Sequence, residues 1–213
     1  MILPAEFYHR PTLEVARELL GKVLVYQSPD GFASGMIVEA EAYIGEGDPA
    51  CHAAVGRTVR NAPLYGPPSL AYVYLNYGLH DMVNAVTEAE GHPSAVLIRG
   101  LEPLEGLPLM RRRRAQAPWR KDKTAVPSHE LCRGPGNLTR AMGITLADNL
   151  RPLTREPLTI RDEGLAPPLV VWDSRIGISV GTDRLWRASV AGHRAVSARR
   201  GGSSDPPVGR RRV

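Results

Sequence analysis

The sequence contains little cysteine and no long apolar run. Its two cysteines, Cys51 and Cys132, lie far apart and match no CxxC or Cys/His spacing. This argues against a disulfide framework or a structural zinc site and favours a reducing compartment. No apolar stretch is long enough to span a bilayer, and the N-terminal residues lack the cationic and apolar regions of a signal peptide. These absences predict a cytoplasmic protein with no membrane partner.

Motifs of several large enzyme classes are missing as well. The sequence has no GxGxxG or GxxxxGKS/T phosphate loop, no GxSxG elbow, and no HExxH or HxE…CxxC metal motif. Dinucleotide-binding, P-loop, serine-hydrolase and zinc-deaminase functions are therefore not indicated.

Positive charge is present and is concentrated in two segments. The 213-residue chain has a net charge of +5. Residues 111–123 (RRRRAQAPWRKDK) hold seven basic residues against one acidic, and residues 199–213 (RRGGSSDPPVGRRRV) hold five against one. One interpretation is a solvated loop and a disordered tail. The other is a surface that contacts phosphates.

The hydrophobic pattern predicts an α+β fold with a mainly antiparallel sheet, because helices and antiparallel strands are mixed along the chain without a regular βαβ order. We expect one domain over 1–198 and a basic, disordered tail over 199–213. Helices are expected over 12–20, in the basic stretch after 103, and as short pieces over 127–144. Strands are expected over 22–27, 35–44, 70–76, 81–88, 95–100, 157–162, 168–180 and 185–192, with a hairpin turn over 28–34 and a long ordered loop over 45–69.

Acidic and apolar residues alternate in the segment IVEAEAYIGEGDPACH. Strict alternation places Ile37, Glu39, Glu41 and Tyr43 on one face of a strand. Carboxylates on that face need water, a hydrogen-bond partner or a substrate. Glu41, with Tyr43 two residues later and His52 just beyond, could hold a water as a general base. A hydrogen-bonded structural carboxylate is the alternative.

A second segment, AYVYLNYGLHDMVNAV, reads as a hairpin rich in tyrosine. Tyr72 and Tyr74 project from the same side of its first strand, Tyr77 lies at the turn, and Asn84 is on the returning strand. Aromatic residues on a strand are commonly core, but a tyrosine at a hairpin tip faces solvent and could act as a wedge between bases.

Six motifs occur in the order and spacing of the alkyladenine (3-methyladenine) DNA glycosylase family. They are GMIVEAEAYIG…ACHA, GRTVRN, YVYLNYGLHDMVN, VLIRGLEPLEGL, ELCRGPGNLTRAMGI and SRIGI. Over about residues 10–198 the chain resembles a compact member of that family. The resemblance implies a curved antiparallel sheet surrounded by helices, with a protruding β-hairpin. It also implies a cytoplasmic, nucleoid-associated monomer of bacterial type that acts on damaged double-stranded DNA and needs no cofactor or metal.

The resemblance also implies the reaction, which is removal of alkylated or deaminated purines by base flipping. The expected substrates are 3-methyladenine, 7-methylguanine, hypoxanthine and ethenoadenine. Glu41 would activate a water, with Arg99 close to that water and the sugar phosphate. Tyr43 and Tyr74 would stack on the flipped base, and His52 would donate a hydrogen bond to it. Because the pocket motifs contain no lysine, we expect a monofunctional enzyme that leaves an abasic site.

The family pattern implies DNA contacts too. Tyr77 would intercalate into the gap left by the flipped base, and Asn84 would discourage the 2-amino group of guanine. Arg57, Thr58 and Arg60 are candidates for contact with the DNA backbone. The sequence departs from the pattern at Val59, where proline is common, and at His80, which follows the wedge where some members carry an aromatic residue.

Three points remain open at this stage. Glu39 shares the predicted face of Glu41, and we expect a structural salt bridge or hydrogen bond for it. A nuclease holding a divalent metal with Glu39, Glu41 and Asp48 is one rival function. A non-enzymatic module that binds nucleic acid through tyrosines and arginines is another.

Overall fold

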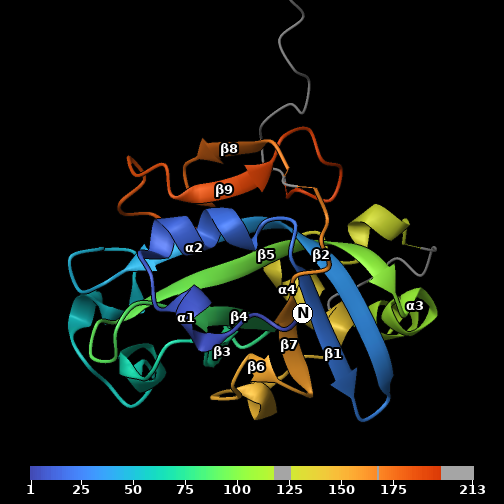
Figure 1. Cartoon of the computed structure of the whole chain (residues 1–213), viewed down its shortest axis with the longest axis horizontal. Helices are drawn as coiled ribbons and strands as arrows, with labels where there is room; N and C mark the ends of the chain where they lie inside the picture. Colours follow the sequence, from blue (N-terminus) through green and yellow to red (C-terminus); the bar gives the residue numbers. More distant parts are fainter. Residues whose placement is uncertain (118–125, 167, 198–213) are drawn as a thin grey trace, which may run out of the picture.

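The computed structural model describes residues 1–117, 126–166 and 168–197 (Figure 1). The predicted tail over 199–213 lies outside these residues, as does the second half of the basic segment. The helices are α1 (Ala5–Tyr8), α2 (Thr12–Leu19), α3 (Leu107–Ala115) and α4 (Pro135–Met142). The strands are β1 (Val23–Ser28), β2 (Gly31–Ile44), β3 (Ala71–Asn76), β4 (His80–Val86), β5 (Ser94–Glu105), β6 (Thr154–Arg155), β7 (Leu158–Arg161), β8 (Val170–Asp173) and β9 (Arg187–Val190). The 3₁₀ turns are η1 (His52–Val55), η2 (Ala62–Tyr65), η3 (Ser128–Glu130) and η4 (Leu146–Asp148).

The nine strands of the described chain form one antiparallel sheet. The strand order is β3-β4-β5-β2-β1-β7-β6, with β9 joining β2 and β8 joining β9. The sheet curls into a half-barrel, α2 packs on β2 and β5, and α4 packs on β4 and β5 (Figure 1). The predicted α+β fold with a mainly antiparallel sheet is confirmed. In the described part of the chain, no helix is both long enough and apolar enough to cross a membrane.

Alternating side chains give the sheet two different faces. One face contributes Val73, Val83, Val96 and Ile98 to the main hydrophobic core, which residues of α2 and α4 complete. The opposite face carries a smaller cluster that includes Tyr72, Val86 and Ala95, with Tyr43 and Tyr74 packed against it. The loop over 45–69, with η1 and η2, lies on this second face and adds Cys51, Ala53 and Leu64 to the cluster. The tyrosines are therefore separated from the main core by the sheet itself.

Strand β2 departs from strict alternation at Val38. Its register with β5 is interrupted between Ile37 and Glu39 and again between Glu39 and Ala40. Ile37 belongs to the main core together with Ala40. The prediction that Ile37 shares a face with Glu39 is therefore wrong, because a β-bulge shifts the alternation by one residue.

Two other boundaries differ from the prediction. The β1–β2 hairpin is tighter than the expected turn over 28–34, since Ser28 pairs with Gly31 and only two residues, Pro29 and Asp30, lie between them. The strand expected over 168–180 ends at Asp173. It ends there because the next side chains turn inward: Arg175 is buried and donates to Asp48 and to a β2 carbonyl.

Two of the four arginines of α3 follow neither interpretation of the basic segment. Arg113 and Arg114 are only 7% and 8% exposed. Arg113 pairs with Asp30 and donates to the last two carbonyls of α4. Arg114 donates to two carbonyls at the end of η3. These two side chains satisfy carbonyl groups at the ends of helices and turns, so they are neither solvated nor free to contact phosphate.

Candidate active site

A row of side chains crosses the open face of the sheet. Tyr72 of β3 lies opposite Asn84 of β4, Asn84 lies opposite Leu97 of β5, and Leu97 lies opposite Glu41 of β2. Directly opposed residues of paired strands project to the same side. Strand pairing thus brings four residues that are distant in sequence to one surface.

Glu41 is fully buried and accepts three hydrogen bonds. Tyr43 Oη donates to Oε2 at 2.9 Å, Arg99 Nη1 donates to the same oxygen at 3.2 Å, and the backbone N–H of Ile176 donates to Oε1 at 2.7 Å. A carboxylate offers about four acceptor positions. The contacts within the described residues therefore leave about one position for a further donor, such as a water.

Glu39 makes the salt bridge that the sequence predicted. Arg99 Nε lies 3.3 Å and Arg187 Nη1 3.1 Å from its Oε1. The backbone N–H of Ser197 donates to Oε2 at 2.9 Å. Arg99 thus bridges the two carboxylates, and Glu39 holds the guanidinium that contacts Glu41.

The environment sets the protonation of these groups. Burial raises the pKa of Glu41, while the charge of Arg99 and hydrogen bonds from Ile176 and Tyr43 oppose that rise. Burial and the neighbouring Glu41 raise the pKa of the Tyr43 hydroxyl, which therefore remains protonated and donates. A carboxylate with a raised pKa is better suited to accept a proton near neutral pH than an ordinary exposed one.

A cavity of about 370 Å³ lies beside these residues. Its volume is within the usual range for small-ligand sites. Six of the predicted site residues line it, namely Tyr43, His52, Tyr74, Tyr77, Asn84 and Arg99. Glu41 is 0% exposed and lies behind the wall, because its three hydrogen-bond partners all line the cavity.

His52 is held by two tyrosines. Its Nδ1 lies 2.9 Å from Tyr72 Oη, and its ring meets the Tyr74 ring edge-on with the centroids 4.5 Å apart. Burial lowers the pKa of His52, so the ring is neutral at pH 7. Burial raises the pKa of the Tyr72 hydroxyl, which we assign as the donor to Nδ1. Nε2 then carries the hydrogen and is a donor.

Asn84 Nδ2 donates to the Tyr72 carbonyl at 2.9 Å, which fixes this amide.

Tyr77 stands at the tip of the β3–β4 hairpin. It is 86% exposed and has a φ of 50°, and Gly78 follows with a φ of 68°. The N–H of Leu79 donates to the carbonyl of Asn76 at 3.0 Å, which closes a turn with Tyr77 and Gly78 at its two central positions. A tyrosine in the left-handed region is strained, and Asn-Gly or Gly-Gly is the usual choice at such a turn. A strained, exposed aromatic residue at the mouth of a cavity motivates a functional hypothesis.

The segment GRTVRN forms an exposed loop near the hairpin. Thr58 and Asn61 exchange hydrogen bonds at 2.6 and 3.2 Å. The Arg57 guanidinium lies 5.5 Å from the Tyr65 ring centroid, and that of Arg60 lies 5.7 Å from the Tyr74 ring centroid. Arg57, Thr58 and Arg60 are all exposed, as a contact with a DNA backbone requires.

A family model described as methylpurine-DNA glycosylase (MPG) matches residues 6–194. The chain belongs to this family. It is therefore a DNA glycosylase of DNA repair, and DNA is its substrate. The resemblance that the six motifs carry is confirmed.

Curated relatives with the printed name "Putative 3-methyladenine DNA glycosylase" match most of the chain. The protein from Methanocella arvoryzae is 48% identical over 189 residues, 87% of this chain and 90% of that protein. The one from Chlorobium phaeobacteroides is 44% identical over 204 residues, 95% and 98%. The one from Rubrobacter xylanophilus is 49% identical over 184 residues, 83% and 87%.

Three contributions to the site were not predicted from the sequence. Tyr72 was recognised as a strand tyrosine but not as the partner of His52. Ile176, in the motif SRIGI, supplies a backbone donor to Glu41, and no side-chain signal marks such a role. Arg175, in the same motif, packs on the Tyr43 ring at 4.6 Å from its centroid. The motif itself was the available signal for both.

The geometry does not favour the metal-dependent nuclease. Asp48 pairs with Arg175 at 2.5 and 2.8 Å, whereas Glu39 and Glu41 both pair with Arg99. Over residues 1–117, 126–166 and 168–197, no three His, Cys, Asp or Glu side chains are grouped so that they could hold a metal ion. Each of the three carboxylates instead faces a guanidinium.

Proposed function

We propose that the protein flips alkylated or deaminated purines out of duplex DNA into the 370 Å³ cavity and hydrolyses the N-glycosidic bond with a water activated by Glu41. The observation that carries this proposal is the position of the buried Glu41 carboxylate. It lies directly behind a tyrosine-lined cavity, within hydrogen-bonding distance of Tyr43 and Arg99. The relatives' printed name supports 3-methyladenine as one substrate.

Flipping requires the target base to leave the stack, which costs a few kcal/mol and less for a damaged base. Tyr77, exposed at the hairpin tip, is suited to fill the vacated space. Arg57 and Thr58, on the exposed loop, would contact the backbone, whereas the Arg60 guanidinium lies against the Tyr74 ring. These contacts would hold the duplex while the nucleotide turns into the cavity.

The cavity offers stacking surfaces and polar groups to a purine. Tyr43 and Tyr74 line it, and stacking on an aromatic side chain contributes about 1–3 kcal/mol per base. The Nε2–H of His52 would donate to the purine edge, and Asn84 would disfavour a base that carries a 2-amino group. Normal bases would be disfavoured because they are harder to extrude and match these groups less well.

The chemical step would use the remaining acceptor position of Glu41. The carboxylate would take a proton from a water aimed at C1′, and its negative charge would stabilise the oxocarbenium-like transition state. Arg99 would hold the carboxylate in place and face the sugar phosphate. No lysine is among the described residues that line the cavity, so the expected product is an abasic site rather than a Schiff base or a broken strand.

The test is single-turnover base release from duplexes that carry one hypoxanthine or one ethenoadenine, and from methylated DNA, with EDTA present. We expect Glu41→Gln to lower the rate by about 10²–10⁴-fold, the usual contribution of a general base. Glu39→Gln is the matched control, because it removes the same charge two residues away on β2 and leaves the Tyr43 and Ile176 contacts of Glu41 in place. It should cost much less.

Three results would contradict the proposal. If Glu39→Gln abolished release and Glu41→Gln spared it, the catalytic assignment would be reversed. Tight, salt-sensitive DNA binding by the wild type without release of any of these bases would favour a binding module. Full release by both variants would exclude Glu41 as the base.

A further inference from the structure

Both tyrosines of the proposed stacking site carry a guanidinium outside the cavity. The Arg60 guanidinium lies 5.7 Å from the Tyr74 centroid, and that of Arg175 lies 4.6 Å from the Tyr43 centroid. Tyr43 and Tyr74 line the cavity, whereas Arg60 and Arg175 are not among its described lining residues. Neither guanidinium is therefore among the cavity-lining groups that a base would touch directly.

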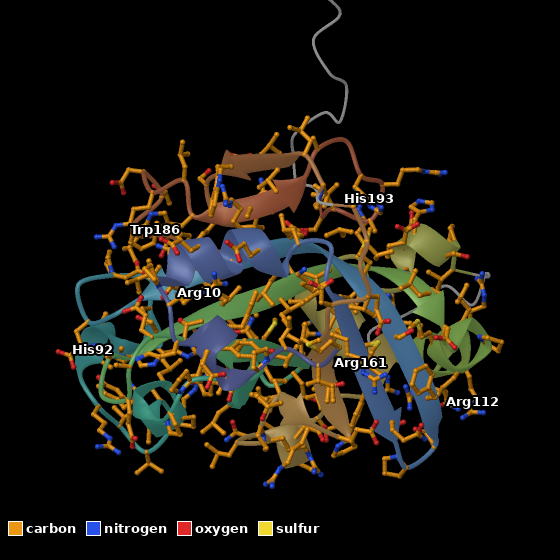
Figure 2. All side chains as sticks on the ribbon, in the orientation of Figure 1. Arg10, His92, Arg112, Arg161, Trp186 and His193 are labelled. Atoms are coloured by element: carbon orange, nitrogen blue, oxygen red, sulfur yellow. The ribbon has the colours of Figure 1, made fainter. Side chains whose placement is uncertain are left out.

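The two arginines differ in how their charge is balanced. Arg175 is buried, is paired with Asp48 through two short contacts, and is enclosed between the rings of Tyr43 and Trp186. Figure 2 shows Trp186 at the end of the sheet opposite Arg112. The acidic partner largely cancels the charge of Arg175, so this stack chiefly fixes the position of Tyr43.

Arg60 has no such partner within the described part of the chain. Its Nη2 donates to the carbonyl of Leu75 at 3.2 Å, and none of the ion pairs among the described residues involves Arg60. Its charge also acts on the cavity wall, because it adds to burial in lowering the pKa of His52. One side of the cavity thus carries an uncompensated positive charge behind an aromatic ring.

We propose that Arg60 is a specificity-determining residue that disfavours cationic alkylated purines relative to neutral purines in the cavity. An aromatic face attracts a cation through its quadrupole. When Tyr74 already engages the Arg60 cation, a second cation stacked on the same ring is repelled by the first. A neutral base such as hypoxanthine stacks without that repulsion. This inference rests on the proposed function, since it requires that a purine occupy the cavity.

The test compares Arg60→Met with Arg57→Met. Arg57 is a matched control because it lies in the same exposed loop, carries the same charge, and stacks on Tyr65, which does not line the cavity. The readout is the ratio of single-turnover rates for 3-methyladenine release from methylated duplex and hypoxanthine release from a defined duplex. A ratio removes any effect on DNA-backbone binding that the two substrates share.

We expect Arg60→Met to raise this ratio about two- to fivefold, the factor that corresponds to a cation–π interaction at an exposed site. Arg57→Met should leave the ratio unchanged even where both rates fall. An unchanged or lower ratio in Arg60→Met would overturn the inference, and so would an equal rise in Arg57→Met. A wild type that releases neither base would instead refute the proposed function.

Discussion

Replacing Tyr43 with phenylalanine removes one hydroxyl and keeps the ring. In the wild type this hydroxyl donates to Glu41 Oε2 at 2.9 Å, inside a fully buried site. Hydrogen bonds to charged groups contribute about 1.5–3 kcal/mol. The variant should therefore lose about that much free energy of unfolding at a pH where Glu41 is ionised, because the buried carboxylate then has one hydrogen-bond donor fewer.

The same change has a predictable effect on the pH dependence of base release. The Tyr43 hydrogen bond lowers the pKa of Glu41, which burial has raised, so removing it raises that pKa further. A general base must be deprotonated, and activity should therefore rise with pH through the pKa of Glu41. The acid limb of the Tyr43→Phe rate profile should lie at higher pH than that of the wild type, with rates that converge again at high pH.

The difference in free energy of unfolding between the wild type and Tyr43→Phe should also depend on pH. A carboxyl group whose folded pKa is raised makes the protein less stable as the pH rises through its titration. This loss is larger in Tyr43→Phe, so the difference from the wild type should be greatest at high pH and should shrink as Glu41 becomes protonated on acidification. Chemical denaturation at several pH values measures it.

Tyr65→Phe is the matched control, because it also removes one tyrosine hydroxyl that donates to a glutamate. That hydrogen bond, to Glu46 at 2.8 Å, is exposed and lies outside the cavity. We expect it to change stability by less than about 1 kcal/mol and to leave the rate profile in place. An acid limb that does not move in Tyr43→Phe, or that moves to lower pH, would refute the reasoning.

Two further substitutions test the hairpin and the basic helix. Tyr77→Asn creates the Asn-Gly pair that this turn favours, so we expect it to raise the free energy of unfolding by about 0.5–1 kcal/mol. The same variant should release hypoxanthine from duplex DNA more slowly than the wild type. Equal release rates would show that Tyr77 has no part in the mechanism. Arg113→Met should lower the free energy of unfolding by about 2–4 kcal/mol, because buried carbonyls of α4 and Asp30 lose their donor. Arg112→Met, at an exposed neighbouring side chain, should change the free energy of unfolding by less than about 0.5 kcal/mol. Denaturant titration measures both variants. Equal losses in the two would contradict the assigned role of Arg113.

Periodicity placed most of the elements correctly because it reports burial within a short window. The predicted helix over 12–20 corresponds to α2, and the strands expected over 70–76 and 81–88 correspond to β3 and β4. Periodicity misplaced Ile37, because the β-bulge next to it arises from pairing with β5 rather than from local sequence. It also could not show that Arg113 would be buried, since four consecutive arginines resemble a solvated surface until the carbonyl groups that bind them are known.

The sequence by itself determined the family, the class of fold and the residue types available for catalysis. These follow from local patterns and from motifs in a fixed order, such as a carboxylate, a tyrosine and a histidine within residues 41–52. Only the tertiary structure decided how those groups are used. Arg99 lies 58 residues from Glu41 in sequence and Ile176 lies 135 residues away, yet both donate to its carboxylate. Contacts at such separations depend on strand register and on where the chain leaves the sheet, which no short window of sequence contains.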